Sequence, residues 1–250
     1  MIKVYKNGQV SAYPPCKKPP TNSIQAGNVK KRYRLTWKHY RHISSSAVVL
    51  WEKKVNKLTF WTFTFREGTI KYQEAVKLFS KFLDNWKKTY GCKHYIWVGE
   101  LTEKGTPHFH MIADIKFVDL KAVNAAFCKV RGDFSNSAVR LPQKYKNGKL
   151  VPDRSVVKNV GSLVRYLCKY LVKTIEDSQE IDFGGRVYAM SRGLTNNYRK
   201  YDTYDQLYQV LGEIKERGTF LMHCGQYCTT YSPTERLENV RTFIEKISKF

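Results

Sequence analysis

The sequence lacks long apolar runs. None of its segments approaches the roughly 18 consecutive apolar residues that a membrane-spanning helix requires. The first ten residues, MIKVYKNGQV, also lack the apolar stretch of a secretory signal peptide. We therefore expect a soluble cytoplasmic protein with no membrane partner.

Cysteine pairs with metal-binding spacing are scarce as well. The six cysteines are scattered, which is typical of reduced thiols in a cytosolic protein rather than of a disulfide framework. Only His223-Cys224-Gly-Gln-Tyr-Cys228 forms a cluster. A structural zinc site takes four ligands in paired knuckles, and no second pair completes this one, so we interpret the cluster as incidental buried thiols.

Acidic residues are few and unevenly placed. The chain has 44 lysines and arginines against 21 aspartates and glutamates, and residues 1–50 contain ten basic residues and no acidic one. A net charge of +23 favours a polyanionic partner, and nucleic acid is the natural choice. The stretch VKKRYRLTWKHYRH could follow a phosphate backbone while its rings stack on bases, or could be a solvated basic face whose rings pack on the domain. The candidate nucleic-acid contacts are Lys30, Lys31, Arg32, Arg34, Trp37 and, farther along the chain, Arg165.

Regular hydrophobic patterns begin at Leu58. The segment LTFWTFTF alternates and is rich in threonine and aromatic residues, as strands are, whereas YQEAVKLFSKFLDNWKKTY places apolar residues at helical spacing. Similar patterns predict the order strand, helix, strand, strand, helix, strand, helix, strand. The strands are 58–65, 94–100, 108–115, a short one within 139–152, and 186–194, and the helices are 72–90, 120–130 and 160–175.

This order of elements predicts an α+β fold. The tight hairpin in its middle favours a central antiparallel-rich sheet that helices cover. We expect three segments along the chain: a basic extension over residues 1–50, a folded domain over 51–204, and an extension with two further helices over 205–250. About the first 25 residues are expected to be irregular.

Two of the six histidines lie two residues apart in GTPHFHMI. Because side chains alternate along a strand, His108 and His110 face one side of it, while Phe109 and Met111 face the core. Two imidazoles on one face can hold one cation, although strand histidines are often satisfied by ordinary hydrogen bonds. Glu100 ends the preceding strand and can lie across the hairpin, which completes a ligand set with open positions for a substrate oxygen. Glu103, in the turn, is a competing third ligand whose other interpretation is a solvated side chain.

A second candidate group lies on the helix predicted over residues 160–175. Two tyrosines and two lysines share one stripe of that helix, opposite an apolar face, and they are Tyr166, Lys169, Tyr170 and Lys173. Such a stripe can also be the solvated margin of an ordinary amphipathic helix. Together with a cation on the histidines, however, it describes attack of a tyrosine hydroxyl on a DNA phosphate, with a lysine offsetting the developing charge.

Three stretches in this order resemble the motifs of the HUH endonucleases, and within them the rolling-circle replication initiators of small single-stranded DNA phages and plasmids. LTFWTFTF is similar to the first motif, GELTEKGTPHFHMI to the second with His108, His110 and the acidic ligand Glu100, and YLCKYLVK to the two-tyrosine form of the third. RVYAMSRGL resembles the stretch that follows the catalytic helix in these initiators. The resemblance covers about residues 58–194.

The resemblance implies a nicking enzyme that acts at a replication origin. Tyr166 and Tyr170 would be the nucleophiles, Lys169 and Lys173 the lysines that follow them, and Mg²⁺ or Mn²⁺ the cofactor. The products would be a 5'-phosphotyrosyl link and a free 3' hydroxyl, and strands would later be rejoined. No GxxxxGK[ST] pattern occurs, so a host helicase and a host polymerase, in a bacterial cytoplasm, are expected partners alongside single-stranded origin DNA.

Other functions remain open on the same residues. A conjugative relaxase or an HUH transposase would use the same chemistry, but Thr106 stands where relaxases often carry a third histidine, and transposases often carry a single tyrosine. A basic single-stranded nucleic-acid-binding protein without catalysis would explain the charge and the aromatic residues. It would leave the histidine pair and the tyrosine stripe to coincidence.

Overall fold

A computed structural model divides the chain into two compact units, Arg32–Thr195 and a unit made of Met1–Lys31 with Asn196–Phe250. Each unit is described by itself. The structure describes residues 1–12, 35–54, 58–68, 70–115, 118–134, 138–146, 149–152, 158–180, 183–195, 197–224, 229–234 and 237–249.

The unit over residues 32–195 is built on a five-stranded antiparallel sheet of order β6-β3-β5-β4-β9. The hairpin of β4 and β5 lies in its centre, where a Gly-Thr-Pro turn joins the two strands. A separate hairpin is formed by β7 and β8. The strands are β3 (Leu58–Thr64), β4 (Tyr95–Leu101), β5 (Pro107–Asp114), β6 (Val139–Arg140), β7 (Gln143–Lys146), β8 (Lys149–Pro152) and β9 (Tyr188–Met190).

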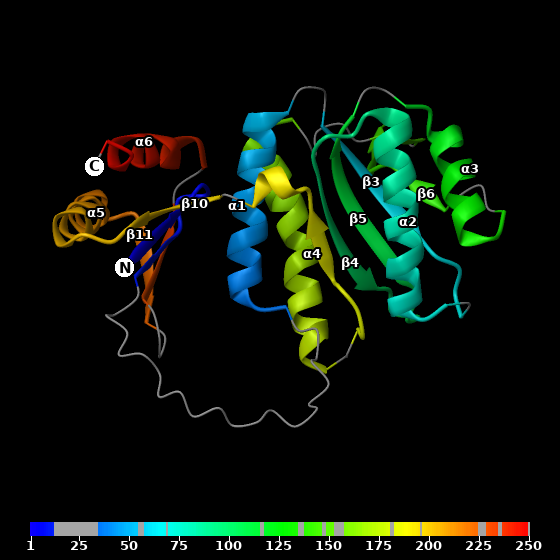
Figure 1. Cartoon of the computed structure of the whole chain (residues 1–250), viewed down its shortest axis with the longest axis horizontal. Coiled ribbons are helices and arrows are strands. Elements are labelled where there is room, and N and C mark those ends of the chain that lie inside the picture. The colour runs from blue at the N-terminus through cyan, green and yellow to red at the C-terminus, as the bar shows by residue number, and fades with distance from the viewer. Residues whose placement is uncertain are drawn as a thin grey trace. The chain divides into compact units, whose positions relative to one another are not determined.

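Helices cover both faces of this sheet (Figure 1). α2 (Tyr72–Tyr90) and α3 (Leu120–Arg131) lie on one face, and α1 (Trp37–Lys53) and α4 (Val160–Glu180) lie on the other. α2 ends at Gly91, whose φ of 63° is a left-handed conformation that glycine adopts without a steric penalty. The predicted α+β architecture, with an antiparallel sheet between helices, is therefore confirmed.

The core on the α2 side of the sheet is mainly aromatic. Phe79 of α2 stacks on Phe109 of β5 with ring centroids 4.5 Å apart, and Phe63 of β3 packs against Phe79 at 5.2 Å. All three are fully buried, which agrees with the strand alternation that places Phe109 away from the histidines. Gly99 of β4 lies under this cluster, where an added Cβ would collide with the Tyr72 hydroxyl and lie 3.0 Å from the Phe109 ring.

The second unit contains a five-stranded antiparallel sheet of order β10-β1-β2-β12-β11. Two amphipathic helices contribute Val210 and Phe243 to a core that also contains Val4 and Val10 of the strands. Its elements are β1 (Ile2–Tyr5), β2 (Val10–Ala12), β10 (Tyr198–Tyr201), α5 (Tyr204–Arg217), β11 (Phe220–Cys224), β12 (Thr229–Pro233) and α6 (Leu237–Ile247).

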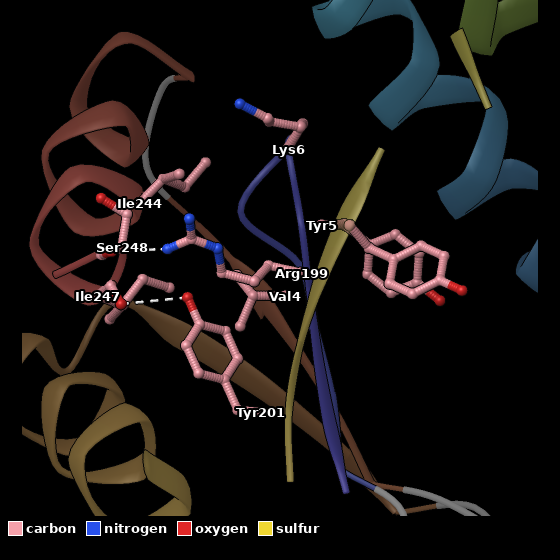
Figure 2. A pocket seen from close by; sticks show the side chains of 9 residues that line it. Val4, Tyr5, Lys6, Arg199, Tyr201, Ile244, Ile247 and Ser248 are labelled. Carbon is pink, nitrogen blue, oxygen red and sulfur yellow. Dashed lines mark hydrogen bonds between the residues drawn. The ribbon is translucent and has the colours of Figure 1, made fainter. Parts of the chain in front are cut away.

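A pocket of about 210 Å³ opens in this unit, with side chains of β1, β10 and α6 around it (Figure 2). On one side of it, the Arg199 guanidinium donates a hydrogen bond of 2.6 Å to the carbonyl of Ser248, and the Tyr201 hydroxyl donates one of 3.1 Å to the carbonyl of Ile247. These carbonyls belong to the end of α6, where a positive charge is favourable. The two contacts therefore fix α6 on the strand β10.

The order of elements expected between residues 58 and 194 is confirmed, and the two helices expected after residue 204 are present as α5 and α6. Two expectations were wrong. Residues 2–5 and 10–12 form strands rather than irregular chain, and β11 and β12 lie between the last two helices. The compact units also differ from the three expected segments, since the boundary after residue 50 falls inside α1.

Helix α1 was missed because three consecutive serines interrupt its apolar pattern. Its apolar residues Ile43, Ala47 and Leu50 are nevertheless fully buried at helical spacing. Ser46 is buried beside them, since its hydroxyl donates to the carbonyl of Leu194 at 3.0 Å. A buried serine satisfied in this way is compatible with a core helix although its residue type suggests a surface position. None of the helices in the described ranges has both the length and the apolar character needed to cross a bilayer.

Candidate metal centre and tyrosine helix

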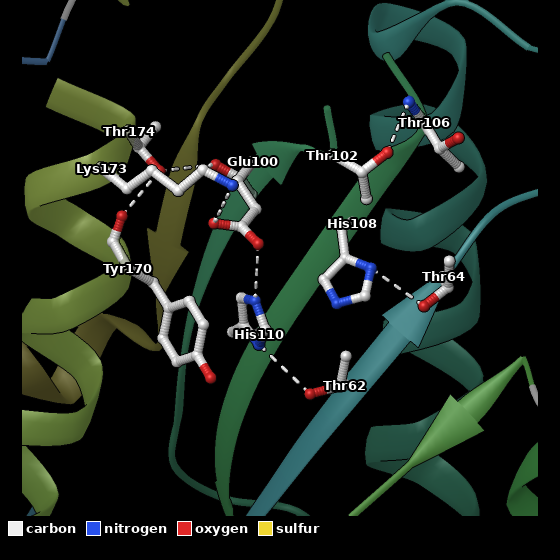
Figure 3. A network of polar contacts seen from close by, with 11 residues as sticks. Thr62, Thr64, Glu100, Thr102, Thr106, His108, His110, Tyr170, Lys173 and Thr174 are labelled. Atoms are coloured by element: carbon white, nitrogen blue, oxygen red, sulfur yellow. Dashed lines mark hydrogen bonds and ion pairs between the residues drawn. The ribbon is translucent and has the colours of Figure 1, made fainter. Parts of the chain in front are cut away.

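The register of the central hairpin brings the three predicted metal ligands together. Glu100 of β4 pairs directly with His108 of β5, and His110 lies one pleat farther along the same face. One potential ligand atom from each of Glu100, His108 and His110 lies within 4.8 Å of the other two. Figure 3 shows the three side chains on one face of the sheet, between β3 and α4.

The contacts of Glu100 are formed with two different elements. Its Oε1 lies 3.1 Å from Nε2 of His110, and its Oε2 lies 3.9 Å from Nζ of Lys173 on α4. The side chains of Glu100 and His110 are both nearly inaccessible to solvent, whereas His108 is half-buried. Among the described residues, Oε2 of Glu100 is buried and has no hydrogen-bond partner. A buried carboxylate oxygen without a hydrogen bond is a strong candidate ligand for a cation.

Two threonines of β3 hold the outer nitrogens of the histidines. Thr62 Oγ1 lies 3.2 Å from Nδ1 of His110, and Thr64 Oγ1 lies 2.9 Å from Nδ1 of His108. An ionised carboxylate only accepts hydrogen bonds, so Nε2 of His110 carries the proton toward Glu100 and Nδ1 accepts from Thr62. A hydroxyl can equally accept from Nδ1–H, which leaves Nε2 free to bind a metal, and it orients the ring in both tautomers.

Burial keeps the imidazoles neutral. It is the main cause that lowers the pKa of His108 to about 4, and the positive charge that His110 can carry lowers it further. Burial likewise lowers the pKa of His110, although the hydrogen bond with Glu100 opposes this. Burial alone would raise the pKa of Glu100, but the hydrogen bond from His110 and the charge of Lys173 outweigh it, so this pKa is lowered. Two neutral imidazoles beside one carboxylate are the protonation states that bind metals.

This donor set fits a divalent cation. Two imidazole nitrogens and one carboxylate oxygen are common ligands of catalytic metals, and three protein ligands leave positions open for substrate oxygens. The face of His110 that does not contact Glu100 or Thr62 is covered by Tyr170, whose ring is stacked on it with centroids 3.5 Å apart. The centre is therefore oriented by threonines on one side and covered by an aromatic ring on another.

Both predicted tyrosines of α4 lie at this centre. Tyr166 packs edge-on against Phe60 of β3 at 4.6 Å, and the rings of Tyr166 and Tyr170 are 5.4 Å apart. Burial, followed by the neighbouring Tyr166 hydroxyl, raises the pKa of Tyr170 well above its usual value. Its phenol is therefore protonated at neutral pH and must lose a proton in order to act as a nucleophile. α4 is anchored here by Thr174, whose hydroxyl donates to the carbonyl of Tyr170 at 2.9 Å and to that of Gly99 at 3.4 Å.

The basic residues of α4 differ in how they meet the centre. Lys173 is half-exposed and contacts Glu100, whereas Lys169 and Arg165 are exposed on the same flank of the helix. Glu103, the competing third ligand, is exposed in the turn between β4 and β5 and does not belong to the cluster. Its expected alternative as a solvated side chain agrees with this position.

Other predicted residues are placed less completely. Trp37 is the first residue of α1. Lys30, Lys31, Arg32 and Arg34 lie outside the described residues, as does Cys228 of the possible zinc cluster. Within the described part of the chain, Cys92, Cys128 and Cys168 are buried free thiols.

The sequence reasoning missed Thr62, Thr64 and Arg140 as members of the site. The signal for the threonines was their spacing of two in LTFWTFTF, which puts both hydroxyls on the face of β3 that pairs with His110 and His108. That pairing could not be known before the strand order. Arg140 of β6 lies in the same row of the sheet as Thr62 and His110.

A family model described as Replication-associated protein ORF2 matches residues 58–175. Over this range the chain resembles replication-associated proteins. The matched range, just under half of the chain, begins with β3 and reaches into α4, so it contains the three candidate ligands and both tyrosines. No curated protein and no solved structure matches the chain. The similarity supports a role in DNA replication.

Proposed function

We propose that the chain is a rolling-circle replication initiator of the two-tyrosine HUH type, which nicks single-stranded origin DNA. The observation that carries this proposal is the stacking of Tyr170 on His110, because it places a candidate nucleophile directly beside the candidate metal ligands. The match to replication-associated proteins over the same residues supports it independently.

Glu100, His108 and His110 would hold Mg²⁺ or Mn²⁺. When bound, such a cation withdraws charge from a phosphate oxygen and makes the phosphorus more electrophilic. Thr62 and Thr64 keep the two imidazole rings oriented toward that position. Glu100 supplies the negative charge that favours a divalent cation over none in a region rich in lysines.

One of the two tyrosines supplies the nucleophile. Its hydroxyl oxygen forms a bond to phosphorus, the bond from phosphorus to the 3' oxygen breaks, and the phenol proton leaves while the 3' oxygen gains one. The products are a 5'-phosphotyrosyl link and a free 3' hydroxyl. Because Tyr166 and Tyr170 lie side by side, the second hydroxyl remains available to attack at a later junction while the first still holds DNA.

The lysines of α4 stabilise the charge that develops on the phosphate. Lys173 already lies 3.9 Å from Glu100, so it can contact a phosphate bound between them, and Lys169 is exposed one turn earlier. Arg165, Trp37 and the basic residues 30–34 would contact the DNA strand away from the nick. The displaced strand requires a host helicase and polymerase, and the expected setting is a bacterial cytoplasm.

The test is formation of a covalent adduct on a denaturing gel. Single-stranded oligonucleotides that tile the replicon encoding the chain are incubated with Mn²⁺, with Mg²⁺ or with EDTA. The variants are Tyr166→Phe, Tyr170→Phe and the double variant, and Tyr208→Phe on α5 is a matched control, since this tyrosine is 75% exposed and lies in the other unit.

We expect an adduct that needs the metal, survives in the control and is lost in the double variant. The two single variants rank the tyrosines. DNA binding without an adduct under either metal would instead favour a non-catalytic single-stranded nucleic-acid-binding protein.

A further inference from the structure

Arg140 extends the candidate site beyond β3, onto the edge strand of the sheet. It pairs with Thr62, and Thr62 pairs on its other side with His110. Residues that pair directly across a sheet point to the same face. The neighbouring pair gives an independent check, because Val139 of β6 is buried opposite Phe63, on the face that α2 covers. The Arg140 side chain therefore leaves the sheet on the same face as His110.

Arg140 is also exposed. Two strand spacings separate it from His110, which is about 10 Å between backbones. Within the part of the chain that the structure describes, no carboxylate forms an ion pair with it. Arg131 makes a useful contrast, because its guanidinium is held by Asp133 and by the carbonyl of Thr64. Of these two arginines near β3, one fixes the fold and the other presents its charge to the solvent beside the site.

Positive charge consequently lies on two opposite sides of the candidate metal centre. Lys173 on α4 contacts Glu100, on the β4 side, and Arg140 lies on the β6 side, beyond Thr62. A single DNA strand carries a phosphate on every nucleotide, so a strand with one phosphate at the metal centre presents its neighbours to both sides. A guanidinium is well suited to this contact, because it binds two phosphate oxygens at once and stays charged.

We propose that Arg140 is a phosphate-binding residue that holds the nucleotide next to the nick, on the side of the metal centre opposite α4. This inference rests on the proposed nicking function and adds a second anchor for the DNA. With Lys173 and Arg140 on either side, the scissile phosphate is held over the histidines by its neighbours rather than by the metal alone.

The test compares Arg140→Gln with Arg140→Lys and with Lys81→Gln. Lys81 is exposed on α2, which covers the other face of the sheet, so its substitution removes the same charge away from the site. The DNA is an oligonucleotide that the wild-type chain converts into an adduct. Its affinity is measured by fluorescence anisotropy in EDTA over a series of salt concentrations, and adduct formation is followed with Mn²⁺ on a parallel gel.

Each phosphate contact on a single strand contributes about 0.7 to the slope of log affinity against log salt, so one contact is worth about fivefold at 0.1 M salt. We expect Arg140→Gln to lose this amount of slope and about fivefold in affinity, while Arg140→Lys keeps the slope and Lys81→Gln resembles the wild type. An uncharged methylphosphonate at the phosphate flanking the nick should weaken the wild type by a similar factor and leave Arg140→Gln unchanged.

Two results would overturn the assignment of Arg140, and they are distinguishable from failure of the nicking function. If the wild type forms an adduct but Arg140→Gln keeps the wild-type slope, the nicking function stands and this contact does not exist. The same conclusion follows if Arg140→Gln and Lys81→Gln lose affinity equally. If the wild type forms no adduct on any oligonucleotide of the replicon, both proposals are wrong.

Discussion

Acid should destabilise the unit over residues 32–195 through His108. Burial lowers the pKa of His108 to about 4, whereas in the unfolded chain it returns to about 6.5. Between these two values the unfolded chain binds a proton that the folded chain does not, so the free energy of unfolding is highest above pH 6.5 and falls as the pH falls toward 4. The difference corresponds to about 3 kcal/mol at most, with a slope no steeper than about 1.4 kcal/mol per pH unit for one proton.

The assay is urea unfolding in EDTA, followed by tryptophan fluorescence. All five tryptophans lie within residues 32–195, so the signal reports on this unit alone. The free energy of unfolding is compared between wild type and His108→Gln at pH 8, 7, 5.5 and 4.5. The advantage of the wild type over the variant should be constant from pH 8 to pH 7, where both states hold a neutral imidazole, and should shrink at pH 5.5 and again at pH 4.5. A difference that stays constant down to pH 4.5 would refute the reasoning, because His108 would then titrate alike in both states.

Three further predictions concern single contacts. Gly99→Ala should lower the free energy of unfolding by about 1–3 kcal/mol in the same urea assay, because its Cβ collides with a buried hydroxyl, whereas Gly212→Ala, which meets no atom within 4 Å, should not. Thr62→Val should weaken Mn²⁺ binding about tenfold in calorimetry by freeing the ring of His110, and unchanged affinity would show that the hydroxyl does not orient it. Arg199→Ala should cost about 1 kcal/mol in unfolding followed by far-UV circular dichroism, and no loss would mean that its contact with the end of α6 is not stabilising.

The central hairpin could be predicted from sequence because its signals are local. Alternation in HFHMIADI sets which side each residue faces, and a short turn fixes β4 opposite β5, so Glu100 and the two histidines follow from spacing alone. The tyrosine stripe follows from helical periodicity in the same way. These signals need no knowledge of the rest of the fold.

The parts that could not be predicted depend on which strands become neighbours. Thr62 and Arg140 join the site only because β3 lies between β5 and β6, and nothing in their own segments states this pairing. The strands β1 and β2 are three or four residues long, too short for alternation to stand out, and they pair with β10 and β12 far along the chain. Their pairing is a tertiary property rather than a local one.

The pairing of β1 with β10 sets an order on how the chain is completed during translation. Ile2 pairs with Tyr201, so the first strand leaves the ribosome long before its partner has been made. At about 5–20 residues per second, the wait is on the order of 10–40 s. Residues 32–195 are all synthesised within that interval. The unit with the metal centre can therefore fold first, and the second sheet closes only after it, around a strand that waited.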